Sequence, residues 1–92
     1  MKFEWDKNKE KTNLVKHGIN FDFTKILFKS KLIVHEDKRK SYGEKRYSAY
    51  GVVLDRCMNI VFTMRHGTIR VISLRKANKR ETRRYYQAIK SY

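Results

Sequence analysis

The chain contains no proline, a single cysteine and only four glycines. Because a disulfide joins two cysteines, the lone Cys57 excludes an internal disulfide framework and a multi-thiolate metal site. No apolar run approaches the roughly 18 residues of a membrane span. The first six residues carry acids and lack an apolar segment, so we expect no signal peptide. These absences favour a folded protein of a reducing, cytoplasmic compartment that does not associate with membranes.

Acidic residues are also scarce, because 9 Asp and Glu stand against 23 Lys and Arg, for a formal net charge of +14. Such a surplus neutralises phosphates and releases their counterions, so nucleic acid is the favoured partner. A membrane-surface helix would concentrate cations on one amphipathic segment, whereas here they are spread along the chain. An acidic protein partner is compatible with the same charge.

The first part of the chain reads as a strand followed by two helices. Its length and its apolar fraction of 40% suit one hydrophobic core, so we expect one domain over residues 1–92. Alternating apolar residues predict a short strand over 3–5. Asp6 can cap a helix that ends near His17, with Gly18 placed to adopt a positive φ. Asn20 or Asp22 can cap a second, short helix in which Phe23, Ile26 and Leu27 share a face.

The second part of the chain changes to strands and ends in a helix. Asn78, with Glu81 three residues on, resembles a capping box for a closing helix, in which Tyr85, Ala88, Ile89 and Tyr92 form an apolar stripe. The fold class is α+β, an antiparallel sheet with two N-terminal helices and a C-terminal helix packed on it. The strands are expected over 32–34, 46–54, 59–65 and 69–74, with a polar connection over 36–45, a turn over 55–58 and an antiparallel meander for the last three.

The meander carries residues suited to RNA chemistry. Cleaving RNA without a metal requires a group that deprotonates the 2′-OH, a group that stabilises charge on phosphorus and a proton for the leaving 5′-oxygen. Glu44 and Arg46 begin one strand and Arg65 ends the next. Arg70 and Arg75 lie on the last strand with opposite parity, so we expect them on opposite faces. One of those two would then serve structure, a partner or a second surface.

The histidines and lysines allow more than one role. His17 can cap helix carbonyls or act as a general base. The histidines and acids show no metal signature, and we expect neither a metal nor another cofactor. Basic clusters would attract the nucleic-acid backbone without reading its sequence. The residues alone do not separate a nuclease from a binder. Expected RNA contacts are Lys7, Lys9, Lys11, Lys38, Arg39, Lys40, Arg70 and Lys76.

Short motifs run in order through nearly the whole chain. They are Phe3-x-Trp5-Asp6, Asn13, Lys16-His17-Gly18-Ile19-x-Phe21, Gly43-Glu44-x-Arg46, Gly51, Thr63-x-Arg65, Arg70-Val71-Ile72-Ser73-Leu74-Arg75-Lys76-Ala77, Glu81 and Tyr85. These motifs resemble those of the BrnT family, the toxin halves of bacterial type II toxin–antitoxin pairs. Leu74 stands where that family usually has a small Ala, and Thr82 where an Arg is common. The resemblance implies a RelE-like fold, RNA cleavage without metal and a BrnA-type antitoxin that carries the complex to promoter DNA.

The leading hypothesis is a metal-independent endoribonuclease toxin that cleaves RNA to inhibit translation and growth. Arg65 and Arg75 would hold the scissile phosphate, with Arg46 in support, and His17 or Glu44 would accept the proton. Two alternatives stay open. One is a non-catalytic nucleic-acid-binding module, and the other is an interaction protein whose basic surface only receives an acidic antitoxin.

Overall fold

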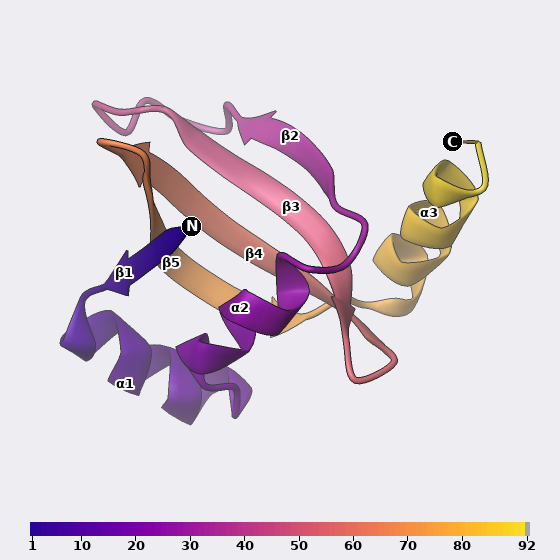
Figure 1. Cartoon of the computed structure of the whole chain (residues 1–92), viewed down its shortest axis with the longest axis horizontal. Coiled ribbons are helices and arrows are strands. Elements are labelled where there is room, and N and C mark those ends of the chain that lie inside the picture. The colour runs from indigo at the N-terminus through magenta and orange to yellow at the C-terminus, as the bar shows by residue number, and fades with distance from the viewer. Residues whose placement is uncertain (92) are drawn as a thin grey trace.

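A computed structural model describes residues 1–91 as a five-stranded sheet with helices on both faces (Figure 1). The sheet has the order β1-β5-β4-β3-β2, which confirms the α+β class. No helix within these residues is long and apolar enough to cross a membrane. The elements are β1 (Lys2–Trp5), α1 (Lys7–His17), a 3₁₀ turn η1 (Phe21–Phe23), α2 (Thr24–Leu27), β2 (Ile33–Asp37), β3 (Arg46–Val53), β4 (Arg56–Arg65), β5 (Thr68–Lys76) and α3 (Lys79–Ile89).

Local capping signals in the sequence correctly predicted the ends of the helices. The Asp6 carboxylate accepts the first backbone N–H groups of α1, and Gly18 ends that helix at φ 68°. Asn20 caps η1. Asn78 and Glu81 form the reciprocal capping box of α3. The last member of the predicted α3 stripe, Tyr92, lies outside the described residues.

The pairing of strands differs from the prediction in two ways. The meander β3-β4-β5 and the β2–β3 pair are antiparallel, but β1 runs parallel to β5, so the sheet is mixed. The predicted turn over 55–58 is also wrong. Only Leu54 and Asp55 form it, at φ 48° and 67°, and the strand resumes at Arg56. Positive φ at both central residues matches the right-handed twist of a tight hairpin. Leucine rarely adopts a positive φ, so the sequence does not indicate a turn at Leu54.

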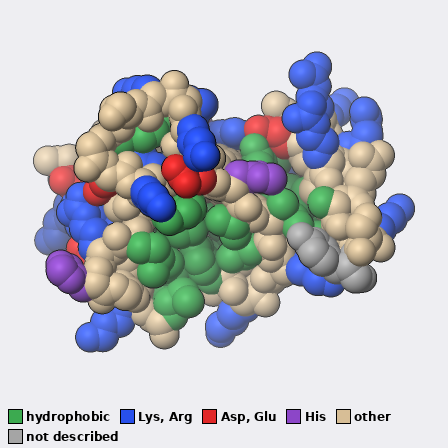
Figure 2. Space-filling model, turned by 90° about the horizontal axis from the view of Figure 1, so that it is seen from above, with side chains coloured by type: hydrophobic (Ala, Val, Ile, Leu, Met, Phe, Trp, Pro, Cys, Tyr) green, Lys and Arg blue, Asp and Glu red, His purple; other side chains and the backbone are tan. Residues whose placement is uncertain are grey.

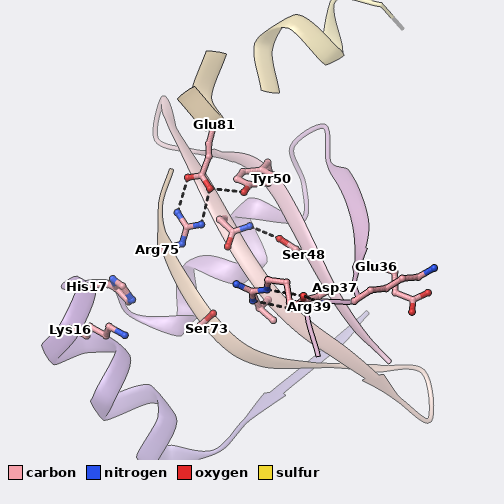
Figure 3. Close-up of a pocket in the computed structure, with 13 residues that line it drawn as sticks. Lys16, His17, Glu36, Asp37, Arg39, Ser48, Tyr50, Ser73, Arg75 and Glu81 are labelled. Carbon is pink, nitrogen blue, oxygen red and sulfur yellow. Dashed lines mark hydrogen bonds and ion pairs between the residues drawn. The ribbon is translucent and has the colours of Figure 1, made fainter. Parts of the chain in front are cut away.

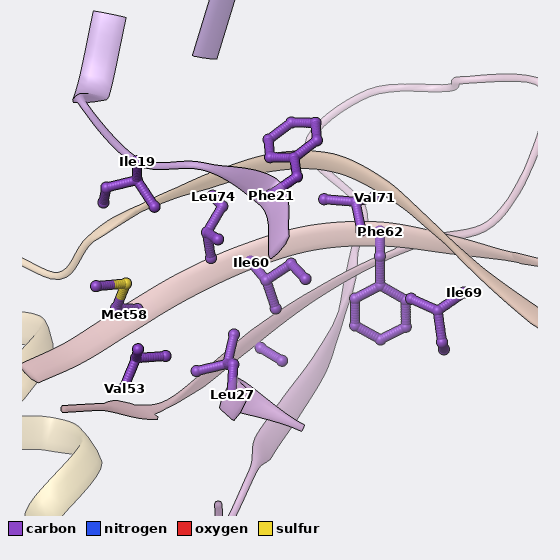
Figure 4. Packing of buried hydrophobic residues seen from close by; sticks show 11 residues of the cluster. Ile19, Phe21, Leu27, Val53, Met58, Ile60, Phe62, Ile69, Val71 and Leu74 are labelled. Atoms are coloured by element: carbon purple, nitrogen blue, oxygen red, sulfur yellow. The ribbon is translucent and has the colours of Figure 1, made fainter. Parts of the chain in front are cut away.

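The sheet lies between two sets of helices. α1, η1 and α2 cover one face, where Phe21, Leu27, Ile60 and Leu74 are fully buried (Figure 4). α3 covers part of the opposite face through Tyr85. The predicted second helix is one 3₁₀ turn followed by a single α-helical turn.

The apolar face predicted for that second helix is wrong at one position. Leu27 is buried as expected, but Ile26 is 43% exposed and points away from the core. Two different helical geometries meet in this short segment, so the α-helical spacing used for the prediction does not hold across it.

A β-bulge in β5 overturns the expected opposition of Arg70 and Arg75. Val61 pairs with Ser73 and Phe62 with Val71, so Ile72 is an extra residue between them. Arg70 pairs with Thr63, and Arg75 pairs with Asn59. Thr63 and Asn59 are four residues apart on β4, so they belong to the same face of the sheet. Both arginines therefore stand on the same sheet face, the one that α3 only partly covers.

Candidate functional site

Positive charge does not by itself locate a site on this molecule. On the face shown in Figure 2, Lys and Arg side chains lie at several separate places around a central patch of hydrophobic side chains. Exposed cations occupy α1, the connection after β2 and α3. A site therefore has to be identified from a hollow in which chemically useful groups meet.

The candidate site is a cleft of about 510 Å³ on the sheet face that α3 partly covers (Figure 3). Since β1 pairs only with residues 68–71 of β5, the second half of β5 is paired with β4 on one side and has no strand on the other, and the end of α1 reaches the cleft there. The sheet forms the floor, and the start of α3 closes one end. The lining residues are Lys16, His17, Glu36, Asp37, Lys38, Arg39, Ser48, Tyr50, Asn59, Val61, Ser73, Arg75 and Glu81.

Arg75 is held at one end of the cleft by Glu81. Its two terminal nitrogens donate to the two Glu81 carboxylate oxygens at 2.8 and 2.9 Å, and Arg75 Nη1 also reaches the Lys76 carbonyl at 3.3 Å. The Tyr50 hydroxyl donates to Glu81 Oε2 at 2.8 Å. An arginine carries more N–H donors than these bonds use. Arg75 is thus fixed in orientation and retains donors for an anion in the cleft.

The same carboxylate caps α3, which links the site to the helix. Glu81 Oε1 accepts the Asn78 backbone N–H at 2.9 Å. The hydrogen bonds from Arg75 are the main reason that the pKa of Glu81 falls from 4.5 to about 2, with Asn78 and Tyr50 adding to it against the opposing effect of burial. Burial and the Glu81 carboxylate raise the pKa of Tyr50.

Glu81 should make the stability of the protein depend on acid pH. Because its folded-state pKa lies below the ordinary value of 4.5, its contribution is complete above that pH and is lost as pH falls toward 2. Urea denaturation of wild type and Glu81→Gln between pH 7 and 2 should show the wild-type free energy of unfolding falling more steeply below about pH 5. Parallel pH dependences for the two proteins would contradict the assignment.

His17 enters the cleft from the end of α1, facing the β5 side (Figure 3). Burial is the largest cause that lowers its pKa below 6.5, and the charges of Lys16 and Arg75 lower it further. A neutral imidazole at neutral pH is the form that can accept a proton.

Asp37 and Arg39 form the wall contributed by β2 and the connection that follows it. Arg39 Nε and Nη2 each donate to the Asp37 carboxylate at 2.9 Å, and the Tyr42 hydroxyl donates at 3.1 Å. These bonds, led by that from Arg39, hold the pKa of the buried Asp37 carboxyl well below its usual range. The Arg39 side chain remains 76% exposed at the rim of the cleft.

The other three residues predicted to be catalytic form a separate cluster toward the far end of the same sheet face. Glu44 Oε1 accepts from Arg65 Nη2 at 3.2 Å, and Glu44 Oε2 lies 3.8 Å from Arg46 Nε. The Arg46 guanidinium lies over the Tyr42 ring, 4.1 Å from its centroid. The structure therefore brings His17 and Arg75 together in the cleft and places Glu44, Arg46 and Arg65 outside its lining.

The predicted RNA contacts fall in different places. Arg39 and Lys38 line the cleft. Arg70 pairs with Glu4 at 2.7 Å. Lys7, Lys9 and Lys11 are exposed on α1, and Lys40 and Lys76 are exposed as well. Within residues 1–91, no group of three or more His, Cys, Asp or Glu side chains is arranged to hold a metal ion.

Sequence reasoning missed the part that Tyr50 and Glu81 play in the cleft. The sequence indicated Glu81 as a helix cap and as a motif residue, and Tyr50 only as part of a strand, and neither was predicted to lie in the site. The capping box close to Arg75 in the sequence could have indicated the pair of Arg75 with Glu81. A carboxylate at the third position of a helix can contact a side chain of the preceding strand as well as cap the helix. Tyr50 belongs to a distant strand, and its position depends on the sheet register.

The comparison with known proteins identifies the family. Residues 5–81 match the family described as "Ribonuclease toxin, BrnT, of type II toxin-antitoxin system". No curated protein sequence matches the chain. The matched range begins at Trp5, the last residue of β1, and ends at Glu81, so it includes α1, strands β2 to β5 and the residues that hold Arg75. The chain belongs to the BrnT family of type II toxin–antitoxin ribonuclease toxins.

Proposed function

We propose that this chain is a metal-independent endoribonuclease whose reaction takes place in the cleft between α1, the sheet and α3. The observation that carries the proposal is the meeting of a proton acceptor, His17, and an oriented guanidinium, Arg75, in one hollow. The family match supports the ribonuclease activity.

The reaction divides into steps that the cleft residues can serve. His17 takes the proton of the ribose 2′-OH, and the 2′-oxygen attacks phosphorus. The bond from phosphorus to the 5′-oxygen breaks, leaving a 2′,3′-cyclic phosphate. The 5′-oxygen takes a proton from water to become a hydroxyl, and His17 releases its proton to the solvent. Arg75 donates to the phosphate oxygens as their charge increases. Glu81 is a positioning residue, because it acts through the orientation of Arg75.

The separate cluster of Glu44, Arg46 and Arg65 has a different role in this proposal. It lies on the same sheet face as the cleft but does not line it. Arg65 is half-exposed and can follow the RNA backbone away from the scissile phosphate. Exposed lysines on α1 and after β2 add attraction without reading sequence. Because His17 lines the cleft together with Arg75 and Glu44 does not, His17 is preferred to Glu44 as the proton acceptor.

The biological setting follows from the family and is part of the same proposal. Residues 1–92 would act in the cytoplasm as one RelE-like toxin domain with two N-terminal helices. RNA cleavage would inhibit translation and growth until a BrnA-type antitoxin covers the toxin, and the complex would bind promoter DNA through the antitoxin. The net charge of +14 is complementary to an acidic segment of such a partner.

Incubating the antitoxin-free protein with RNA in excess EDTA tests the activity. We expect cleavage to continue and to yield fragments that end in 2′,3′-cyclic phosphate and begin with a 5′-hydroxyl. Circular dichroism of the same sample shows whether the protein is folded. Intact RNA in the presence of folded protein, or cleavage that stops on adding EDTA, would contradict the proposal.

One observation favours a second candidate, a non-catalytic RNA-binding module. The charge of Arg75 is already neutralised by a bidentate pair with Glu81, as it would be in a purely structural role. That candidate gives salt-sensitive RNA binding without cleavage. The fragment analysis in EDTA distinguishes the two.

A further inference from the structure

A second hollow, of about 550 Å³, continues from the cleft into the crevice between α3 and strands β2 and β3. Ser48, Tyr50 and Glu81 line both hollows, so they are adjacent and share a boundary. An RNA chain whose phosphate lies at Arg75 has a neighbouring nucleotide within reach of this crevice. The continuity indicates that the two hollows receive parts of one ligand.

The walls of the crevice differ in character from those of the cleft. It has an apolar wall, formed by Ile33 from β2 and by Tyr85 and Ala88 from α3, whereas Ser48, Tyr50 and Glu81 form the side that it shares with the cleft. Tyr85 is 4% exposed, and its hydroxyl is bonded to the Lys31 carbonyl at 2.6 Å, so the ring is held in place. Rigid apolar walls of this kind suit a flat ring better than a hydrated sugar or phosphate.

Two polar side chains at the mouth of the crevice come from opposite walls. His35 belongs to β2 and Arg84 to α3, and both are exposed. Imidazole and guanidinium planes stack on nucleobases and donate hydrogen bonds to their edges. An apolar interior with such groups at its entrance is the arrangement by which proteins hold an unstacked base of single-stranded RNA.

We propose that the crevice between α3 and β2–β3 is a nucleobase subsite, which holds the base of a nucleotide next to the scissile phosphate between His35 and Arg84. This inference rests on the proposed function, since the phosphate at Arg75 determines which nucleotide reaches the crevice. The subsite would make cleavage depend on the base at that position.

Binding of uncleavable RNA tests the subsite without requiring catalysis. The probes are fluorescent 2′-O-methyl homopolymers of the four bases, about 12 nucleotides long, and an abasic chain of the same length. The variants are His35→Ala and Arg84→Ala. Arg83→Ala is the matched control, because Arg83 is the adjacent exposed arginine of α3 but lines a different hollow, beside Arg56 and Tyr86. Thermal melting confirms that each variant is folded.

We expect Arg84→Ala and His35→Ala to lower the affinity for the preferred homopolymer by roughly 5- to 100-fold, the range of a lost base-stacking contact. Arg83→Ala should cause a smaller loss that is the same for every base. On the abasic chain, Arg84→Ala and Arg83→Ala should have equal effects, because both then remove only a charge.

The outcomes separate this inference from the proposed function. Equal losses for Arg84→Ala and Arg83→Ala on every homopolymer, with no loss for His35→Ala, would overturn the subsite, even if the protein cuts RNA. A base-dependent loss confined to the crevice variants would support the subsite, even if no cleavage is observed, in which case only the proposed function fails.

Discussion

Replacing His17 with Ala should slow RNA cleavage by roughly 10²–10⁴-fold, the usual loss on removing a general base. His17 lines the cleft together with Arg75, and its lowered pKa keeps the imidazole neutral at neutral pH. The side chain lies at the end of α1 and is partly exposed, so the variant should remain folded. Single-turnover cleavage of a labelled RNA measures the loss.

The pH dependence of cleavage provides a sharper test of the same role. A general base must be unprotonated, so the wild-type rate should fall on the acid side of a pKa below 6.5, and this limb should be absent in His17→Ala. His66→Asn is the matched control, because His66 lies at the exposed β4–β5 turn with φ 51°, a conformation that Asn tolerates. If Glu44→Gln removed the acid limb and His17→Ala did not, the roles would be reversed.

The largest loss of stability is expected from Asn13→Ala. The Asn13 side chain is 5% exposed and connects α1 to β5. Its amide nitrogen donates to the Leu74 carbonyl at 2.8 Å and to the Ile19 carbonyl at 3.1 Å, and its oxygen accepts the Leu74 N–H at 3.0 Å. Removing it leaves buried backbone groups without partners, which should cost about 2–4 kcal/mol of unfolding free energy.

That loss should be visible as a large change in thermal stability. For a domain of this size, 2–4 kcal/mol corresponds to a Tm lower by roughly 10–30 °C. Asn8→Ala is the matched control, since Asn8 is an exposed residue of the same helix and should change Tm little. Equal Tm changes for the two variants would mean that the Asn13 hydrogen bonds contribute no more than helix propensity does.

Features that depend on neighbouring residues were predictable from the sequence. The Asp6 cap, the Gly18 terminus and the Asn78–Glu81 capping box each involve groups within a few residues, and all are confirmed. The meander β3-β4-β5 was predictable for the same reason, because its connections are short.

Features that depend on distant parts of the chain were not predictable in this way. The parallel pairing of β1 with β5 joins the first strand of the chain to the last, and no local pattern encodes it. The Leu54–Asp55 turn uses positive φ at a leucine, against the usual preference. Which side of the sheet α3 occupies follows from packing of Tyr85 against strands far away in sequence.

The candidate site shows the same division. His17 and Arg75 were selected from motifs, and the cleft contains both. Glu44, Arg46 and Arg65 were selected from motifs in the same way, but the sheet register places them together elsewhere on the same face. Residue type indicates which groups can do the chemistry, and only the register indicates which of them meet.

The extra residue Ile72 also affects how related chains should be aligned. Because it reverses the alternation of β5 between Arg70 and Arg75, a one-residue gap in this segment changes which side of the sheet an arginine occupies. If such a gap is placed a few positions away, the residues between the two positions are equated with residues on the opposite face of the sheet. When another sequence is aligned with this chain, the position of a gap within β5 should therefore be decided from the strand pairing.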